Sequence, residues 1–143
     1  MKNEYLCPYC RGNLKVENNI IFAVRTKNEQ RGLLLFSPEL WNYRCHKHES
    51  LDLKEGERIE TFCPMCHSNL KAISVNRNLA EVIMVDANGD EYEIYFSEVV
   101  GEHSTFKIKD TDIESFGDDS GDYINYFGAW FIRLREFVVQ TCE

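Results

Sequence analysis

Alternating apolar and polar residues run through the first half of the chain, and this period of two predicts β-strands. Residues 14–17 and 20–26 alternate on either side of Asn18-Asn19, a pair that tolerates the positive φ of a tight hairpin turn. A polar turn follows, and an apolar run then extends from Leu33 to Phe36. Further alternating stretches cover residues 41–45, 51–54 and 58–62. The pattern predicts a small antiparallel sheet in this half.

The second half begins with the clearest hairpin pattern of the chain. Two alternating segments, residues 80–87 and 90–96, are joined by Asn88-Gly89, the preferred pair of a type I′ turn. A two-residue turn at this point would place Ile83 opposite Ile94 on one apolar face. Another alternating segment, residues 105–109, predicts a further strand.

Two helices are predicted after these strands. Residues 111–114 have the pattern of a capping box, and Gly117 would end the short helix that this box begins. A longer helix is expected from Ser120 or Asp122 to about Val138, because apolar residues recur there at steps of three and four. Those residues are Tyr123, Tyr126, Phe127, Trp130, Phe131, Leu134, Phe137 and Val138. The apolar stripe would either cover the second-half sheet or bind a partner, including a second copy of the chain.

These elements predict an α+β fold that is mainly antiparallel β and ends in an amphipathic helix. A chain of 143 residues with 43% hydrophobic and 13% aromatic residues can bury a modest core. It has no apolar run near the roughly 18 residues of a membrane span, and its first residues lack the apolar stretch of a secretion signal. We therefore expect a cytoplasmic protein with reduced cysteines.

Charge is distributed unevenly along the chain, whose net charge is −8. Residues 1–72 carry 11 Lys and Arg against 9 Asp and Glu, a net of +2, whereas residues 73–143 carry 5 against 15, a net of −10. An acidic chain repels phosphate backbones, so nucleic acid is not expected to be the main partner. The near-neutral first half leaves a local contact with nucleic acid as an alternative.

The candidate chemistry lies in two Cys-Pro-x-Cys stretches. Cys7-Pro8-Tyr9-Cys10 and Cys63-Pro64-Met65-Cys66 are both followed by x-x-Asn-Leu-Lys, so the same extended pattern occurs twice. A gap of two residues lets both sulfurs of a stretch converge on one point, and proline after the first cysteine restricts the turn. Four thiolates complete the tetrahedral shell of one metal ion.

The paired stretches resemble the cysteine knuckles of zinc ribbons, within the wider rubredoxin-like group. The resemblance covers about the first half of the chain and implies a metal, zinc rather than iron, held by Cys7, Cys10, Cys63 and Cys66 in a structural role. We therefore expect a zinc-ribbon-like β domain over residues 1–72. The residue pattern adds an inserted small sheet to it, and it predicts an acidic α+β region over residues 73–143 that packs on this domain. Family knuckles usually place glycine after the second cysteine, where φ is positive. Arg11 and His67 occupy those positions here.

Other interpretations of the cysteines remain open. Cys-Pro-Tyr-Cys is also the redox tetrapeptide of glutaredoxins, but that motif needs a buried strand before it and a helix after it. Only six residues precede Cys7, and a β pattern follows Cys10. Cys45 and His48 have ligand-like spacing and form a less favoured addition to the site. The simpler interpretation places Cys45 on the inward face of a strand and His48 in a loop.

The sequence favours a zinc-ribbon protein without catalytic activity, because no nucleophile–base pair can be identified. Its function would then lie in protein–protein contact, as an accessory or regulatory factor. The first alternative is a rubredoxin-like electron carrier or a thiol-redox protein that uses the same cysteines. The second is nucleic-acid contact through the N-terminal ribbon.

Overall fold

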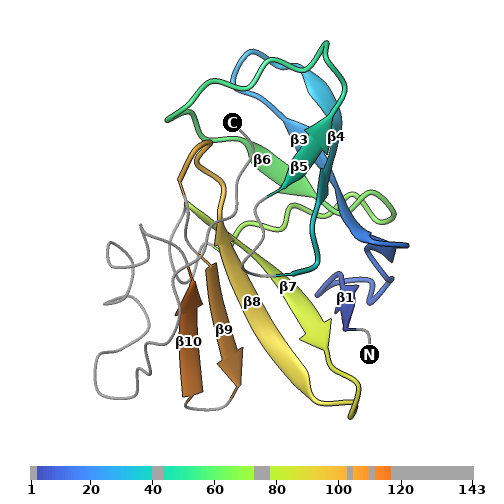
Figure 1. Cartoon of the computed structure of the whole chain (residues 1–143). Helices are drawn as coiled ribbons and strands as arrows, with labels where there is room; N and C mark the ends of the chain where they lie inside the picture. Colours follow the sequence, from blue (N-terminus) through green and yellow to red (C-terminus); the bar gives the residue numbers. More distant parts are fainter. Residues whose placement is uncertain (1–2, 40–43, 73–77, 103–104, 110–111, 117–143) are drawn as a thin grey trace.

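The computed structural model describes residues 3–39, 44–72, 78–102, 105–109 and 112–116, and this part of the chain is all-β (Figure 1). Its strands form two antiparallel sheets. Sheet A has the order β1-β7-β8-β9-β10, and sheet B has the order β2-β3-β4-β5 with β6 also paired to β3. The strands are β1 (Glu4–Leu6), β2 (Lys15–Val16), β3 (Asn19–Arg25), β4 (Arg31–Phe36), β5 (Cys45–Lys47), β6 (Glu60–Phe62), β7 (Leu79–Val85), β8 (Glu91–Ser97), β9 (Thr105–Lys109) and β10 (Asp112–Phe116).

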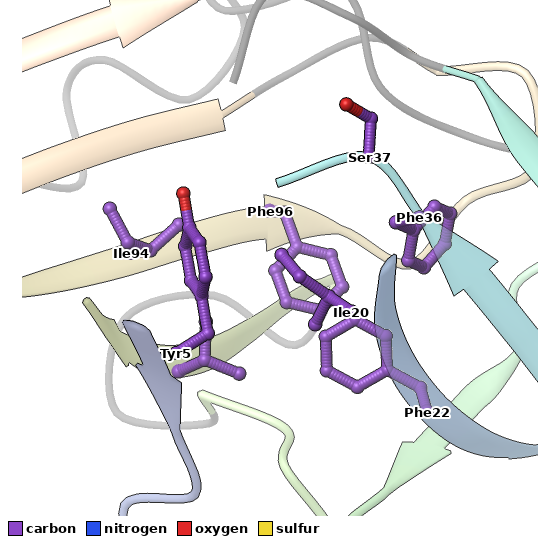
Figure 2. Close-up of a pocket in the computed structure, with 8 residues that line it drawn as sticks. Tyr5, Ile20, Phe22, Phe36, Ser37, Ile94 and Phe96 are labelled. Atoms are coloured by element: carbon purple, nitrogen blue, oxygen red, sulfur yellow. The ribbon is translucent and has the colours of Figure 1, made fainter. Parts of the chain in front are cut away.

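The core lies between the two sheets because every second residue of the long strands points inward. Strand β3 buries Ile20, Phe22 and Val24, and β7 buries alternate residues in the same way. Phe22 meets Phe36 of β4 and Phe96 of β8 with ring centroids 5.5 and 5.2 Å away (Figure 2). Aromatic contacts at such distances add about 0.5–1.5 kcal/mol per pair beyond the burial of their area.

The described part of the chain consists of two structural repeats. Strand β6 corresponds to β1, since each leads directly into a cysteine knuckle, and β7, β8 and β9 follow one another with the same spacing as β3, β4 and β5. The burial patterns of β3 and β7 agree. Buried and half-buried residues alternate from Ile20 in β3 and from the equivalent residue Ala80 in β7. The sequence similarity around the cysteines is therefore the visible part of a repeat that covers most of the described chain.

The two repeats exchange strands. Strand β1 of the first repeat pairs with β7 of the second, and β6 of the second pairs with β3 of the first (Figure 1). The registers are equivalent, since Tyr5 lies opposite Met84 and Thr61 lies opposite Val24. The segments after the knuckles do not exchange: Lys15 pairs with Ile20, and Lys71 pairs with Ala80. Each sheet thus contains strands from both repeats.

Equivalent loops join the first two long strands of each repeat. The Asp86 N–H donates to Asp90 O at 3.0 Å and the Gly89 N–H to Asp86 O at 3.0 Å, which encloses three loop residues rather than two. Gly89 has a φ of 87°, as the last position of such a loop requires. One additional loop residue shifts the pairing by one, so Ile94 lies opposite Val82. The predicted pairing of Ile83 with Ile94 is wrong for this reason.

The predicted α+β class is also wrong for the part of the chain that the structure describes. No helix occurs in the described ranges, and residues 112–114 of the capping-box segment lie in strand β10, which pairs with β9 along its full length. Five residues are too few for a stable isolated helix, so pairing with a neighbouring strand outweighs the local capping signal. The longer helix predicted up to Val138 lies outside the described residues.

Candidate metal centre

Each cysteine knuckle is a tight turn held between a strand and a return segment. Strand β1 ends at Leu6, which bridges to Asn13, and β6 ends at Phe62, which bridges to Asn69. One residue earlier in each strand, a backbone hydrogen bond to the return segment closes the turn. The Leu14 N–H donates to Tyr5 O at 2.7 Å, and in the second repeat the Leu70 N–H donates to Thr61 O at 2.9 Å. The strands fix where each knuckle begins and ends.

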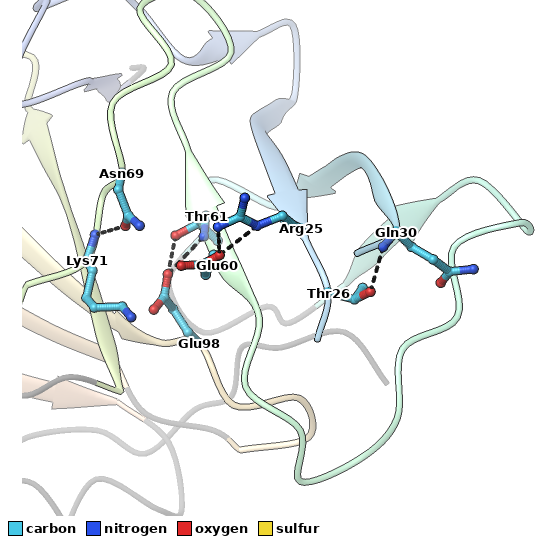
Figure 3. Close-up of polar contacts among 8 residues, drawn as sticks. All are labelled: Arg25, Thr26, Gln30, Glu60, Thr61, Asn69, Lys71 and Glu98. Atoms are coloured by element: carbon cyan, nitrogen blue, oxygen red, sulfur yellow. Dashed lines mark hydrogen bonds and ion pairs between the residues drawn. The ribbon is translucent and has the colours of Figure 1, made fainter. Parts of the chain in front are cut away.

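Residues after the cysteines have an evident structural purpose. The side chain of Asn13 accepts a bond from the Lys15 N–H at 2.9 Å, and Asn69 accepts the same bond from Lys71 (Figure 3). The leucine between each asparagine and lysine is 1% exposed and belongs to the core. Turn formation and core packing therefore account for the repeated Asn-Leu-Lys, a role that was not predicted from the sequence.

The positions where family knuckles place glycine have the expected backbone geometry. Arg11 has a φ of 60° and His67 a φ of 66°, both in the left-handed region. Their N–H groups donate to the first cysteine of each knuckle, Cys7 O and Cys63 O, at 2.9 Å. A non-glycine residue in this region costs about 1–2 kcal/mol. Arg11 and His67 thus place the backbone of the two knuckles under strain.

The four sulfurs converge on one point between the knuckles. Cys7 Sγ lies 3.7 Å from Cys66 Sγ, and Cys10 Sγ lies 3.8 Å from Cys63 Sγ. All four ligand atoms lie within 4.8 Å of one another. In a tetrahedron with Zn–S bonds of about 2.3 Å, neighbouring sulfurs are about 3.8 Å apart. The donor set and its dimensions therefore fit a zinc-ribbon-like metal site.

Backbone N–H groups surround the sulfurs. Cys7 Sγ accepts bonds from Tyr9 N–H at 3.3 Å and Cys10 N–H at 3.5 Å, and Cys63 Sγ accepts two bonds of 3.4 Å from the equivalent groups. Such donors stabilise thiolate charge. The first cysteine of each knuckle is buried, whereas Cys10 is exposed. The site is closed on its inner side and reaches the surface on its outer side.

The thiols of the site differ in acidity. Burial raises the pKa of the Cys7 thiol. Ser68 Oγ lies 3.3 Å from Cys66 Sγ, and its hydroxyl can donate to the thiolate, which lowers the pKa of Cys66 to about 6. Because a metal ion binds thiolates, loading the site must release the protons that the buried thiols hold. The role of Ser68 was not predicted from the sequence, because serine is not a usual metal ligand and Ser68 acts on Cys66 only through a hydrogen bond.

The less favoured ligands lie elsewhere. Cys45 begins strand β5, and His48 follows that strand with its Nδ1 2.8 Å from Ser50 Oγ. Cys45 is not among the free cysteines of the described residues, so its sulfur is not a candidate donor. Within the described ranges, the residues that bring three or more ligand atoms together are the four cysteines of the paired knuckles. The structure places neither Cys45 nor His48 among them.

Comparisons with protein-family models, with curated proteins and with solved structures found no match to this chain. Among the residues that the structure describes, no helix could span a lipid bilayer. In the residues that the structure describes, the fold and the site together define an all-β arrangement of two strand-exchanged repeats with a four-cysteine cluster that could hold a metal ion.

Proposed function

We propose that this chain is a non-catalytic zinc protein in which one structural zinc joins the two repeats, and that it acts through protein–protein contact as an accessory or regulatory factor. The observation that carries the proposal is the position of the sulfur cluster. It lies where β1 and β6 leave their own repeats, so an ion bound there would connect the two exchanged segments directly.

The chemistry of the donor set supports a structural role. Four cysteine ligands fill the tetrahedral shell of zinc, whereas catalytic zinc sites keep one position for water or substrate. Cys7 and Cys63 are 0% exposed, which limits access from the core side. The zinc ion would supply cross-linking and neutralise thiolate charge, and the chain's own N–H groups and Ser68 would hold the sulfurs in place.

An iron-containing electron carrier is the second candidate. The same four sulfurs suit iron, and the exposed Cys10 would bring the ion close to the surface, where an electron could be exchanged with a partner. This candidate uses the same ligands and differs in the metal. Metal identity therefore separates the two proposals.

Metal analysis of the full chain, purified without added metal or chelator, tests the proposal. We expect one zinc per chain and a colourless protein, and the Cys10→Ser variant should contain much less zinc. A protein with one iron and visible thiolate charge-transfer absorption would support the electron carrier instead. A folded protein that contains no metal and binds none when titrated with zinc would contradict both candidates.

A further inference from the structure

The four sulfurs of the candidate metal centre form two close pairs. Cys7 Sγ lies 3.7 Å from Cys66 Sγ, and Cys10 Sγ lies 3.8 Å from Cys63 Sγ. Each pair joins a cysteine of one knuckle to a cysteine of the other. A disulfide has an S–S length of about 2.05 Å, so the two sulfurs of a pair need to approach by about 1.7 Å, which side-chain rotation can supply. The arrangement that fits a metal ion therefore also suits disulfide bonds between the repeats.

The two cysteines of each pair differ in exposure. Cys7 and Cys63 are buried, whereas Cys10 is exposed and Cys66 is half-buried. A small oxidant that arrives from solvent meets the second cysteine of a knuckle first, because the oxidation of a thiolate depends on its exposure. Each accessible sulfur then has a buried sulfur of the other knuckle in contact with it. A bond between Cys7 and Cys63 would instead join the two sulfurs that solvent reaches least.

A disulfide between the knuckles would do more for the fold than one within a knuckle. The two cysteines of one knuckle are 3 positions apart in the chain, whereas the close pairs are 59 and 53 positions apart. A cross-link that closes a longer loop removes more chain entropy from the unfolded state. The pairing of β1 with β7 and of β6 with β3 also keeps the two knuckles facing each other. Cross-knuckle disulfides would thus join the repeats as a bound ion does.

We propose that the four-cysteine centre is a site of reversible oxidation, at which a peroxide converts the thiolates into two disulfides, Cys7–Cys66 and Cys10–Cys63. The thiolates that bind the ion are lost, so zinc leaves while the repeats stay joined. This inference rests on the proposed structural zinc, and it names how that site would be regulated.

The chemistry balances with hydrogen peroxide as the oxidant. The Cys10 thiolate attacks one peroxide oxygen and breaks the O–O bond, which gives a sulfenic acid and hydroxide. The Cys63 thiolate then attacks the sulfenic sulfur, forms the S–S bond and displaces a second hydroxide. The same two steps join Cys66 to Cys7. In total, four thiolates pass four electrons to two peroxide molecules, and four protons from solvent convert the hydroxides into four waters.

Disulfide mapping of the zinc-loaded full chain tests the inference, because trypsin places the two knuckles in separate peptides, residues 3–11 and 59–71. Two equivalents of hydrogen peroxide are added, released zinc is measured with a chromogenic chelator, and free thiols are alkylated before digestion. We expect one equivalent of released zinc and the two peptides joined as one species. Dithiothreitol should separate the peptides and allow zinc to bind again. Separate peptides with a disulfide inside each knuckle, sulfinic or sulfonic cysteines, or no oxidation would overturn the inference.

Two matched variants identify which sulfurs pair. Cys10→Ser should form the Cys7–Cys66 disulfide. Its Cys63 should remain free and become alkylated. Cys66→Ser should form the Cys10–Cys63 disulfide and leave Cys7 free. A bond between the two cysteines of the intact knuckle in either variant would contradict the proposed pairing. Tandem mass spectrometry of the linked peptides from the unmodified chain makes the same distinction if a variant does not fold.

Thermal unfolding gives a readout of the fold itself. The oxidised, zinc-free chain should have a higher Tm than the reduced, zinc-free chain, because the disulfides close the same long loops as the ion. Equal Tm values would show that the disulfides do not join the repeats.

Zinc content before oxidation separates this inference from the proposed function. A chain that holds zinc but forms disulfides only within its knuckles contradicts the cross-knuckle oxidation alone. A chain that holds no zinc but still gives the linked peptides contradicts the structural-zinc proposal alone.

Discussion

Removal of the metal should lower the stability of the whole domain, because the sulfur cluster joins distant parts of the chain. The two close sulfur pairs connect residues that are 59 and 53 positions apart. A cross-link that closes a loop of about 56 residues removes chain entropy from the unfolded state worth about 4 kcal/mol at 25 °C. For a chain of this size, 1 kcal/mol corresponds to about 2–4 °C in Tm, so we expect a decrease of about 8–16 °C.

Thermal unfolding followed by circular dichroism, with the zinc-loaded chain before and after treatment with excess chelator, measures this decrease. The Cys10→Ser variant is the control, since chelator should have little further effect on a chain that has already lost one ligand. Cys10 is exposed, so its replacement by serine disturbs little core packing. An unchanged Tm after complete metal removal would show that the knuckles are held by their own hydrogen bonds and core contacts, and would refute the cross-link reasoning.

Two further changes test the strain and the buried charge of the fold. His67→Gly should raise the free energy of unfolding by roughly 0.5–1 kcal/mol, because glycine adopts the observed φ of 66° without strain but loses more entropy on folding. Urea unfolding measures this free energy. A less stable variant would contradict the reasoning and indicate that the imidazole has a stabilising role of its own. Burial raises the pKa of Glu98, so between the ordinary and the raised pKa the folded chain holds a proton that the unfolded chain releases, and stability falls as pH rises. The stability of Glu98→Gln relative to the unmodified chain should therefore increase as the pH rises above the ordinary pKa of a glutamate. Urea midpoints of the two chains that stay parallel as the pH rises would contradict this assignment.

The local part of the site could be predicted from the sequence. Paired cysteines with proline between them, repeated with the same flanking residues, indicated which sulfurs meet, and alternation located strands such as β3, β4 and β8. These signals work because they depend on residues that are close in the sequence. The convergence of Cys7 and Cys63 follows from two equivalent turns and needed no knowledge of the remaining fold.

Long-range pairing could not be predicted in the same way. The register of β7 with β8 depends on whether Asp86 closes a loop of two or three residues, and Asn88-Gly89 is compatible with both. Residues 112–116 form a strand because β9 offers an edge beside them, a fact that the local capping pattern does not contain. The repeat beyond the knuckles was likewise hidden, since equivalent positions of β3 and β7 differ in residue type while keeping the same alternation of burial.

One pair of equivalent positions shows how the repeats diverged. In the first repeat, the Tyr5 hydroxyl donates to Pro38 O at 2.5 Å. The equivalent residues of the second repeat are Thr61 and Glu98, and there the smaller residue stands on the exchanged strand while the larger one approaches from the other side. The Glu98 carboxylate accepts bonds from Thr61 N–H at 3.0 Å and from its hydroxyl at 2.5 Å (Figure 3).

The two arrangements occupy equivalent positions in their repeats, but their energetic costs differ. Tyr5 satisfies its single hydroxyl, whereas Glu98 Oε1 is buried and has no hydrogen-bond partner within the described structure. An unsatisfied buried polar atom costs about 1–3 kcal/mol, so the second repeat bears a penalty that the first avoids. Because β6 carries Thr61 into the sheet of the other repeat, this penalty lies at a junction between the repeats. A metal ion that holds the two knuckles together would offset the cost of the buried Glu98 oxygen. Such an ion would then stabilise the junction between the repeats as well as the two knuckle turns.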